Sequence, residues 1–297
     1  MGWRRRPKMY VDGARVLVTG GARGIGAATA AAFVRRGAHV WIGDVDDDAC
    51  ERTAADLGVR AGRLDVTSTA SWRELLDRIE TSDGPVDILV NNAGVMPIGP
   101  FGDETEEVRD LILDVNVRGL LNVMQAVLPG MAERGRGSVV NVASMAGMIP
   151  VPGMVTYNAS KFAALGASLD ARQEYSGTGV GISAVLPSAV RTELASGGIS
   201  GSGVPTVEPE DVAEAVLDVA VSGAARRSVP RWVAPAWDLT ALVPEAVHDA
   251  ARRLVGDRRI LTSIDTADRG AYVERVSRQA REHSEAGGVS DQLAGNQ

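Results

Sequence analysis

Two residues with the spacing of one helical turn form a pair that could move a proton. Tyr157 and Lys161 are four residues apart, which places both side chains on one face of a helix. A free tyrosine has a pKa of about 10 and is a poor base at neutral pH, whereas a nearby cation favours the phenolate and lowers that pKa. A surface pair without function has the same spacing, so the surrounding motifs must decide.

A glycine-rich segment lies between a predicted strand at residues 14–19 and a predicted helix at residues 24–36. Glycines let the chain turn tightly there, and they let a pyrophosphate approach the backbone amides at the helix N-terminus. Because strand, loop and helix occur in this order, the segment predicts dinucleotide binding. The predicted contacts are Gly20, Ala22, Arg23, Gly24, Ile25 and Gly26.

An acidic residue closes the next predicted strand and bears on the choice of cofactor. Asp44 follows Gly26 by 18 residues, where a carboxylate can accept hydrogen bonds from the adenosine ribose and repel a 2′-phosphate. Arg23 favours the opposite choice, since a basic residue in the loop could pair with that phosphate. A carboxylate facing a phosphate is costly, so the sequence favours NAD over NADP.

Two further strand ends carry polar residues. Asp65 is placed to bind the adenine edge through its side chain or through the backbone of Val66. The segment Asn92, Ala93 and Gly94 is expected to form the floor of the site beside the adenosine ribose. Turn chemistry explains Asp and Asn at strand ends equally well, so both interpretations stay open.

The elements that must position these residues alternate along the chain. Apolar runs predict strands at residues 14–19, 38–43, 86–90, 138–142 and 181–186, a strand that ends at residues 64–66, and a last edge strand at 228–233. Helical patterns cover residues 24–36, 48–57, 71–80, 104–133 with a break near Pro129, 157–175 and 208–221. Strands that are apolar on both faces and separated by helices imply a parallel sheet covered on both sides. We therefore predict an α/β fold, a single-domain Rossmann-type doubly wound sheet of about seven strands with a C-terminal helical extension.

The composition limits the function classes. The 297 residues carry a formal net charge of -7, which argues against broad nucleic-acid binding. The single cysteine permits no intramolecular disulfide, and the three histidines lie apart from one another and from the cysteine, which predicts no metal site. No stretch reaches the roughly 18 apolar residues of a spanning helix, and a cytoplasmic location is expected.

In combination, these motifs resemble the short-chain dehydrogenase/reductase family over about residues 10–233. The family pattern includes Thr-Gly-x-x-x-Gly-x-Gly, Asn-Asn-Ala-Gly, a serine after the fifth strand and Tyr-x-x-x-Lys. This chain has them at residues 19–26 and 91–94, at Ser144 and at residues 157–161, in the family's order.

The resemblance implies a role for each catalytic residue. Tyr157 is then the general acid/base, Ser144 hydrogen-bonds the substrate oxygen, and Lys161 holds the nicotinamide ribose and lowers the tyrosine pKa. Asn116 matches a helix asparagine that supports a water-linked proton path to the lysine.

The resemblance also assigns the segment that flanks the nicotinamide. Pro187 begins it, Val190 offers its backbone to the carboxamide, and the Thr192 side chain assists. Ser188 departs from the family, which commonly has glycine at this position. The departure concerns the local backbone and not the chemistry.

Apolar residues near the expected substrate face suggest a lipophilic secondary alcohol or ketone, although each is explained equally by core packing. They are Met96, Met148, Ile149, Val151, Met154, Leu194 and Ile199. The Gly/Ser-rich residues 193–206 are either a lid over the crevice or an ordinary flexible loop.

The predicted function is an NAD(P)-dependent oxidoreductase that interconverts such an alcohol and ketone. The alternative is a regulator that senses NAD(H) without turnover. A sensor would not need Ser144, Tyr157 and Lys161 together.

The last part of the chain is predicted to extend a catalytic domain at residues 1–233. In the extension, 234–297, residues 235–255 would lie on a membrane surface, cap the substrate pocket or pack at a subunit interface. Packing or capping is favoured because the stretch is short and interrupted by Pro244. Residues 272–282 read as a polar helix, and residues 286–297 are expected to fray. The resemblance implies a homodimer or homotetramer that pairs through the helices carrying Asn116 and Tyr157.

Overall fold

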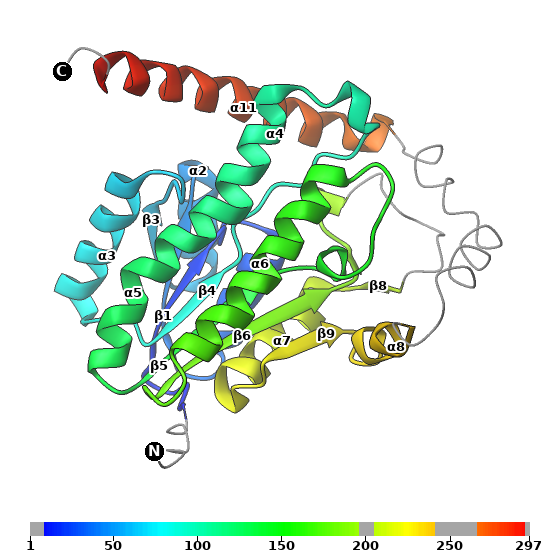
Figure 1. Ribbon diagram of the computed structural model, residues 1–297. Coiled ribbons are helices and arrows are strands. Elements are labelled where there is room, and N and C mark those ends of the chain that lie inside the picture. The colour runs from blue at the N-terminus through cyan, green and yellow to red at the C-terminus, as the bar shows by residue number, and fades with distance from the viewer. Residues whose placement is uncertain (1–8, 196–204, 241–265, 295–297) are drawn as a thin grey trace.

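A parallel sheet of seven strands forms the centre of the protein (Figure 1). The computed structural model describes residues 9–195, 205–240 and 266–294. Across the sheet the strands are β3 (Arg60–Arg63), β2 (His39–Asp44), β1 (Arg15–Thr19), β4 (Ile88–Asn91), β5 (Gly137–Val142), β6 (Val180–Pro187) and β9 (Arg226–Val229). The order reverses between β1 and β4, and in doubly wound sheets ligands bind outside the carboxyl ends of the strands at such a switch point. The predicted doubly wound α/β fold is confirmed.

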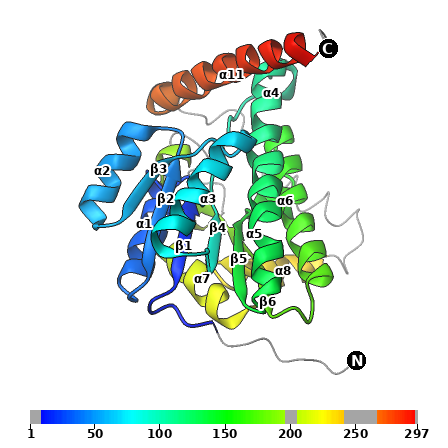
Figure 2. The same ribbon diagram turned by 90° about the vertical axis from the view of Figure 1, so that its left-hand side faces the viewer.

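Helices cover both faces of this sheet, and Figure 2 shows α1 and α2 on one side with α5 and α6 on the other. One face packs against α1 (Gly24–Val34), α2 (Asp47–Leu57) and α7 (Pro209–Ser222). The other packs against α3 (Thr69–Asp83), α5 (Leu120–Glu133) and α6 (Val155–Glu174). Neighbouring residues of one strand serve opposite faces: Val18 belongs to the first core and Leu17 to the second.

Side-chain caps begin several helices, but the helix after the glycine loop has none. Asp46, Ser68 and Thr105 each accept a hydrogen bond from the amide three residues ahead. At α1 the cap residue is Arg23, whose side chain makes no capping hydrogen bond. The first amides of α1 are therefore available for a ligand.

Two strand predictions had the wrong bounds. The third strand ends at Arg63 rather than at residues 64–66, because the chain turns at Asp65, whose amide donates to the Ser71 hydroxyl. The last strand is β9, not residues 228–233. Pro230 has no amide to continue the ladder, and α8 (Val233–Thr240) begins soon after.

The long helix predicted at residues 104–133 is interrupted, but not at Pro129. It consists of α4 (Glu106–Leu113), a π-helical turn η2 (Asp114–Gly119) and α5, and Pro129 lies within α5. The interruption falls at Asn116, whose side chain reaches across to the backbone of Val95.

This stretch, Glu106–Glu133, is also long and apolar enough to cross a membrane, contrary to the expectation that no stretch approaches that length. Half of its apolar window is buried inside the protein, and a core helix passes the same test.

Short elements complete the described chain. They are η1 (Phe101–Asp103), η3 (Met145–Gly147), η4 (Glu193–Ala195) and a separate two-stranded sheet of β7 (Ala189–Val190) and β8 (Thr206–Val207). Most of the proposed lid, residues 196–204, lies outside the described residues, as do residues 241–255 of the apolar tail segment and Ile199.

The C-terminal extension ends in α11 (Thr266–Ala294), which packs across α4 (Figure 1). The helix is longer than the predicted 272–282 and continues through residues 286–294, where fraying was expected. The division into a domain at 1–233 and an extension at 234–297 stays a prediction.

Candidate active site

The glycine loop after β1 is shaped by backbone contacts that exclude side chains. A Cβ on Gly26 would lie 2.0 Å from the Gly20 carbonyl oxygen, and one on Gly20 would lie 2.8 Å from the Ala93 Cα. Gly20 and Gly24 also have positive φ angles, of 63° and 53°. The loop therefore holds bare backbone against the uncapped start of α1, as a pyrophosphate cradle requires. Ala22 is buried and Ile25 packs on the core below.

Asp44 ties the end of β2 to this loop. One of its carboxylate oxygens accepts from the Ala22 amide at 3.1 Å, and the other accepts from the Asp46 amide at 3.1 Å. Arg23, the residue that favoured NADP, pairs with Asp46 at 2.5 Å. That guanidinium holds the pKa of the Asp46 carboxyl below its usual range. The only basic side chain of the loop thus already has an acidic partner.

The side chain of Asn92 braces the loop. Its amide donates to the Thr19 and Gly20 carbonyl oxygens at 3.1 and 2.9 Å. The Thr19 hydroxyl in turn accepts from the backbone amides of Asn92 and Ala93, both at 3.0 Å. Sequence reasoning did not assign this role to Thr19, although the residue begins the glycine motif.

The turn after β3 uses its polar groups locally. One Asp65 oxygen accepts from the Thr67 amide and hydroxyl at 2.9 and 2.7 Å. The Val66 carbonyl accepts from Asn122, and the Val66 side chain packs where a Cβ on Gly119 would stand. These contacts support the turn interpretation for Asp65, and the adenine contact stays a prediction.

Tyr157, Ser144 and Lys161 come together as predicted. The Ser144 hydroxyl is hydrogen-bonded to the Tyr157 phenol, and Lys161 Nζ lies 5.7 Å from the centre of the Tyr157 ring. The lysine donates to the Val142 carbonyl at 3.1 Å. Tyr157 and Lys161 are only 7% and 6% exposed, so they do not form the surface pair that was the alternative interpretation.

Burial governs the titration of this pair. It raises the pKa of Tyr157, against the hydrogen bond from Ser144, and it lowers the pKa of Lys161 to about 8. Lys161 is not among the groups that shift the Tyr157 pKa here, so a lowering by the lysine together with a charged nicotinamide stays a prediction. Desolvation of the phenolate outweighs the other influences on Tyr157.

Asn116 joins the segment after β4 to α6. Its side chain accepts from the Val95 amide at 2.9 Å and donates to the Val95 carbonyl and the Ser160 hydroxyl, both at 3.0 Å. A Cβ on Gly94 would lie 3.2 Å from Asn116 Oδ1 and 3.5 Å from Lys161 Nζ. Asn116 and the lysine thus meet at Gly94, although the asparagine side chain is fully engaged.

The segment after β6 folds back over the glycine loop. A Cβ on Gly24 would lie 3.1 Å from a methyl carbon of Thr192, and the Thr192 amide donates to the Val190 carbonyl at 2.8 Å. Pro187 ends β6. Ser188, the departure from the family pattern, donates its hydroxyl to the Pro205 carbonyl at 2.6 Å and so fixes the local backbone.

Apolar side chains surround Tyr157, but fewer than predicted. Met96, Ala146 and Met154 are buried with it, and Ile98, Val151 and Leu194 pack against this group. Met148 and Ile149 pack on the core beneath the sheet instead, as the alternative interpretation held.

Side chains of α11 also reach the site, and sequence reasoning missed them. The Met96 amide donates to the Tyr272 hydroxyl at 2.7 Å, and Arg269 donates to the Met96 carbonyl. Tyr272 and Arg269 are 4% and 1% exposed. The signal that could have found this face is the spacing of Tyr272, Val276 and Ala280, at i, i+4 and i+8.

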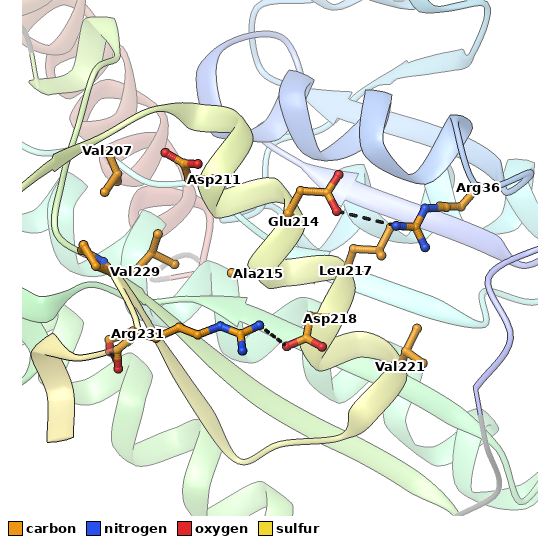
Figure 3. Close-up of a pocket in the computed structure, with 12 residues that line it drawn as sticks. Arg36, Val207, Asp211, Glu214, Ala215, Leu217, Asp218, Val221, Val229 and Arg231 are labelled. Atoms are coloured by element: carbon orange, nitrogen blue, oxygen red, sulfur yellow. Dashed lines mark hydrogen bonds and ion pairs between the residues drawn. The ribbon is translucent and has the colours of Figure 1, made fainter.

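A separate pocket of about 680 Å³ lies beside α7 and the end of β9 (Figure 3). Its acidic residues are already engaged: Glu214 pairs with Arg36 at 3.8 Å, Asp218 with Arg231 at 3.5 Å, and Asp211 accepts from the Glu208 amide. None of the predicted site residues lines this pocket. Within the described ranges, no cluster of His, Cys, Asp or Glu could hold a metal ion.

Known proteins resemble the chain in sequence. A family model described as short chain dehydrogenase matches residues 14–199. Oxidoreductase UcpA of Salmonella typhimurium is 39% identical over 191 residues, which are 62% of this chain and 72% of that protein. A 3-alpha-(or 20-beta)-hydroxysteroid dehydrogenase of Mycobacterium tuberculosis is 37% identical over 60% of this chain and 69% of its own length. Probable oxidoreductase EphD of the same organism is 31% identical over 83% of this chain, which spans 46% of that longer protein.

Solved structures resemble the fold. A 3-ketoacyl-(acyl-carrier-protein) reductase from Brucella melitensis, complexed with NADH, has a TM-score of 0.68 at 27% identity, over 74% of this chain and 97% of its own. The structure of gox2181 has a TM-score of 0.70 at 28% identity, over 76% of this chain and 100% of its own.

Proposed function

The chain belongs to the short-chain dehydrogenase family, and from this premise we propose that it is an NAD-dependent oxidoreductase that interconverts a lipophilic secondary alcohol and its ketone. The observation that carries the proposal is that the buried Tyr157 and Lys161 lie together with Ser144 at the carboxyl end of the sheet. A sensor without turnover would not need this group.

The residues present fit a dinucleotide. The glycine cradle leaves no room for a Cβ at Gly26, and the start of α1 carries no side-chain cap. Thr192 lies over Gly24, so that Pro187, Val190 and Thr192 would flank the nicotinamide end. Gly20, Ala22, Gly24 and Ile25 would hold the pyrophosphate, while Asp65, Val66, Asn92, Ala93 and Gly94 would line the adenosine end.

The carboxylates support NAD as the cofactor. Asp44 stands beside the Ala22 amide, and Arg23 is paired with Asp46. A 2′-phosphate at this place would meet two carboxylates and a guanidinium already in an ion pair, which is unfavourable.

The chain's own residues would handle the proton. When bound, the nicotinamide supplies the chemistry of accepting or returning a hydride. In reduction, the protonated Tyr157 phenol donates to the ketone oxygen while the Ser144 hydroxyl hydrogen-bonds that oxygen. Because burial raises the Tyr157 pKa, the proton-donating form predominates at neutral pH. In oxidation the phenolate removes the hydroxyl proton, and Lys161 and Asn116, which meet at Gly94, would lead the proton away.

The substrate is proposed to be lipophilic because the side chains packed around Tyr157 are apolar. A similar protein is named a hydroxysteroid dehydrogenase, whose named substrate is a lipophilic secondary alcohol.

We propose that the protein is a homodimer or homotetramer in the cytoplasm, without nucleic-acid partners. Exposed apolar side chains lie on α5 and α6, among them Leu121 and Phe162 at 45% and 47% exposure. Burial raises the pKa of the Cys50 thiol to about 12, so the residue is an unreactive part of the core.

NADH formation tests the proposal directly. Secondary alcohols from 2-butanol to 1-decalol should support NADH absorbance with the wild-type protein, with the larger alcohols preferred. Tyr157→Phe should lower turnover at least about 10³-fold and leave NADH binding within about twofold, since only the proton-transfer group is lost. Turnover retained in Tyr157→Phe contradicts the mechanism, and wild-type NADH binding without turnover of any alcohol favours the sensor.

A further inference from the structure

The helix α11 brings a second buried tyrosine to the region around Tyr157. Tyr272, Val276 and Ala280 pack with Leu111 and Ile112 of α4. Leu194 packs against this group and also against the apolar group that contains Tyr157. Tyr272 therefore lies next to the proposed reaction site.

Met96 links the two tyrosines. Its side chain is buried with Tyr157, while its amide donates to the Tyr272 hydroxyl at 2.7 Å. The two phenols are close enough to interact electrostatically. Burial raises the pKa of Tyr157, and Tyr272 adds to that rise.

The Tyr272 hydroxyl has a proton that it can still donate. A phenol can accept one hydrogen bond and donate another, and the Met96 amide uses only the accepting role. Among the residues that the structure describes, none accepts the proton of this hydroxyl. A buried donor of this kind favours a ligand oxygen as its partner.

The surroundings keep Tyr272 in its donating form. Burial raises its pKa, against the Met96 amide and the guanidinium groups of Arg269 and Arg275. These groups lie 5.0 and 5.3 Å from the ring centre, and Arg275 also pairs with Glu193 at 2.6 Å. The positive charge favours an electron-rich oxygen near the hydroxyl.

We propose that Tyr272 is a specificity-determining residue, whose hydroxyl donates to a second oxygen of the substrate, away from the carbon that reacts at Tyr157. The substrate class is then a lipophilic ketone or secondary alcohol with an additional acceptor oxygen, such as a second carbonyl. The reaction at Tyr157 in this inference rests on the proposed function, whereas the binding of the second oxygen by Tyr272 does not.

A binding experiment tests the inference separately from the proposed function. The Tyr157→Phe protein, saturated with NADH, is titrated with 1-decalone and with decalin-1,5-dione, which share a carbon skeleton and differ in one carbonyl. The dione should bind about three- to tenfold more tightly, the range that one hydrogen bond supplies. Adding Tyr272→Phe should abolish this preference and leave the affinity for 1-decalone within about twofold.

A matched control separates the hydroxyl from the docking of α11. Val276→Ala removes buried contact from the same helix, so it should lower the melting temperature yet keep the preference for the dione. The inference is overturned if neither ketone binds, if the dione is not preferred, if the preference survives Tyr272→Phe, or if Val276→Ala abolishes it equally. A Tyr272-dependent preference without turnover in the wild type would instead refute the proposed function and keep the inference.

Discussion

Tyr157 and Tyr272 are both buried phenols beside Met96, and they differ in what surrounds the oxygen. Tyr157 is hydrogen-bonded to a serine hydroxyl, which can donate or accept, and a lysine stands 5.7 Å from its ring. The Tyr272 hydroxyl accepts a hydrogen bond from a backbone amide, which can only donate, and two guanidinium groups lie over the tyrosine ring. The surroundings of Tyr157 suit proton transfer, and those of Tyr272 suit a hydroxyl that stays protonated and donates a hydrogen bond. Under the two proposals, the same type of side chain would serve two tasks on the two sides of the site, the cofactor side and the α11 side.

The cations differ as well. Burial lowers the pKa of Lys161 to about 8, so this charge can be lost within the working range of an enzyme. Guanidinium groups stay protonated at any physiological pH. We therefore expect pH to act on the cofactor side of the site and leave the α11 side unchanged.

After Tyr157→Phe, the largest predicted effect comes from Lys161→Met. Turnover should fall about 10²-fold or more, because the proposed proton route and the proposed ribose contact are both lost. The cofactor-free protein should nevertheless become more stable at pH 7. Burial of the ammonium destabilises the folded wild type by about 3 kcal/mol, and the substitution removes this penalty. The substitution also removes the hydrogen bond to Val142, which costs the variant about 1 kcal/mol, so a net gain in stability remains.

The sign of the pH dependence follows from the lowered pKa. Below about pH 8 the lysine is charged in the folded and unfolded wild-type chains, so the penalty is present in full. Between about pH 8 and 10.5 the unfolded chain holds the proton more tightly, and the wild type gains stability relative to Lys161→Met. Urea unfolding at pH 7 and pH 10 measures this. A stability difference that is equal or larger at pH 10 would contradict it.

A smaller effect is expected from Asp44→Asn, which removes charge on the cofactor side and keeps an acceptor for the Ala22 amide. The ratio of kcat/KM for NADP to that for NAD should rise at least about tenfold, equivalent to about 1.4 kcal/mol. Initial rates with both cofactors give the ratio. The matched control is Asp46→Asn, which frees Arg23 and should shift the ratio less. An unchanged ratio in Asp44→Asn would assign cofactor choice elsewhere.

The cofactor side could be predicted because its determinants are local in sequence. The glycine loop, Asp44 and the pair of Tyr157 and Lys161 each act through spacings of a few residues within one element or its turn. Strand patterns then place these segments at one edge of the sheet, since parallel strands have their carboxyl ends together. The fold and the placement of these residues follow from such patterns, while their roles toward a cofactor stay predictions.

The α11 side could not be predicted, since its contacts join residues that are far apart along the chain. Residues 272–282 read as a polar helix because only a narrow stripe, Tyr272, Val276 and Ala280, is buried. Arg269 is fully buried, against the usual preference of arginine for the surface. The π-helical turn at Asn116 was not predicted for the same reason. The Asn116 side chain binds the backbone of Val95, which follows a different strand. Pro129 gave a stronger local signal for a break, yet α5 continues through it.

The smallest predicted effect tests how α11 is attached. His283 Nε2 lies 2.7 Å from an Asp114 oxygen, and Asp114 also pairs with Arg118 at 3.1 Å. Because both side chains of the histidine pair are partly exposed to water, His283→Gln should change the free energy of unfolding by less than about 1 kcal/mol. Urea unfolding at pH 7 measures this, with Arg118→Gln as the control on the same carboxylate. A loss above about 2 kcal/mol would mean that α11 is held from its far end, and Tyr272 would then be positioned by His283 rather than by Met96. A loss within the expected range leaves the packing of Tyr272, Val276 and Ala280 on α4, together with the hydrogen bonds to Met96, as the attachment of α11. The residue proposed to select the substrate would then also help to fix the helix that carries it.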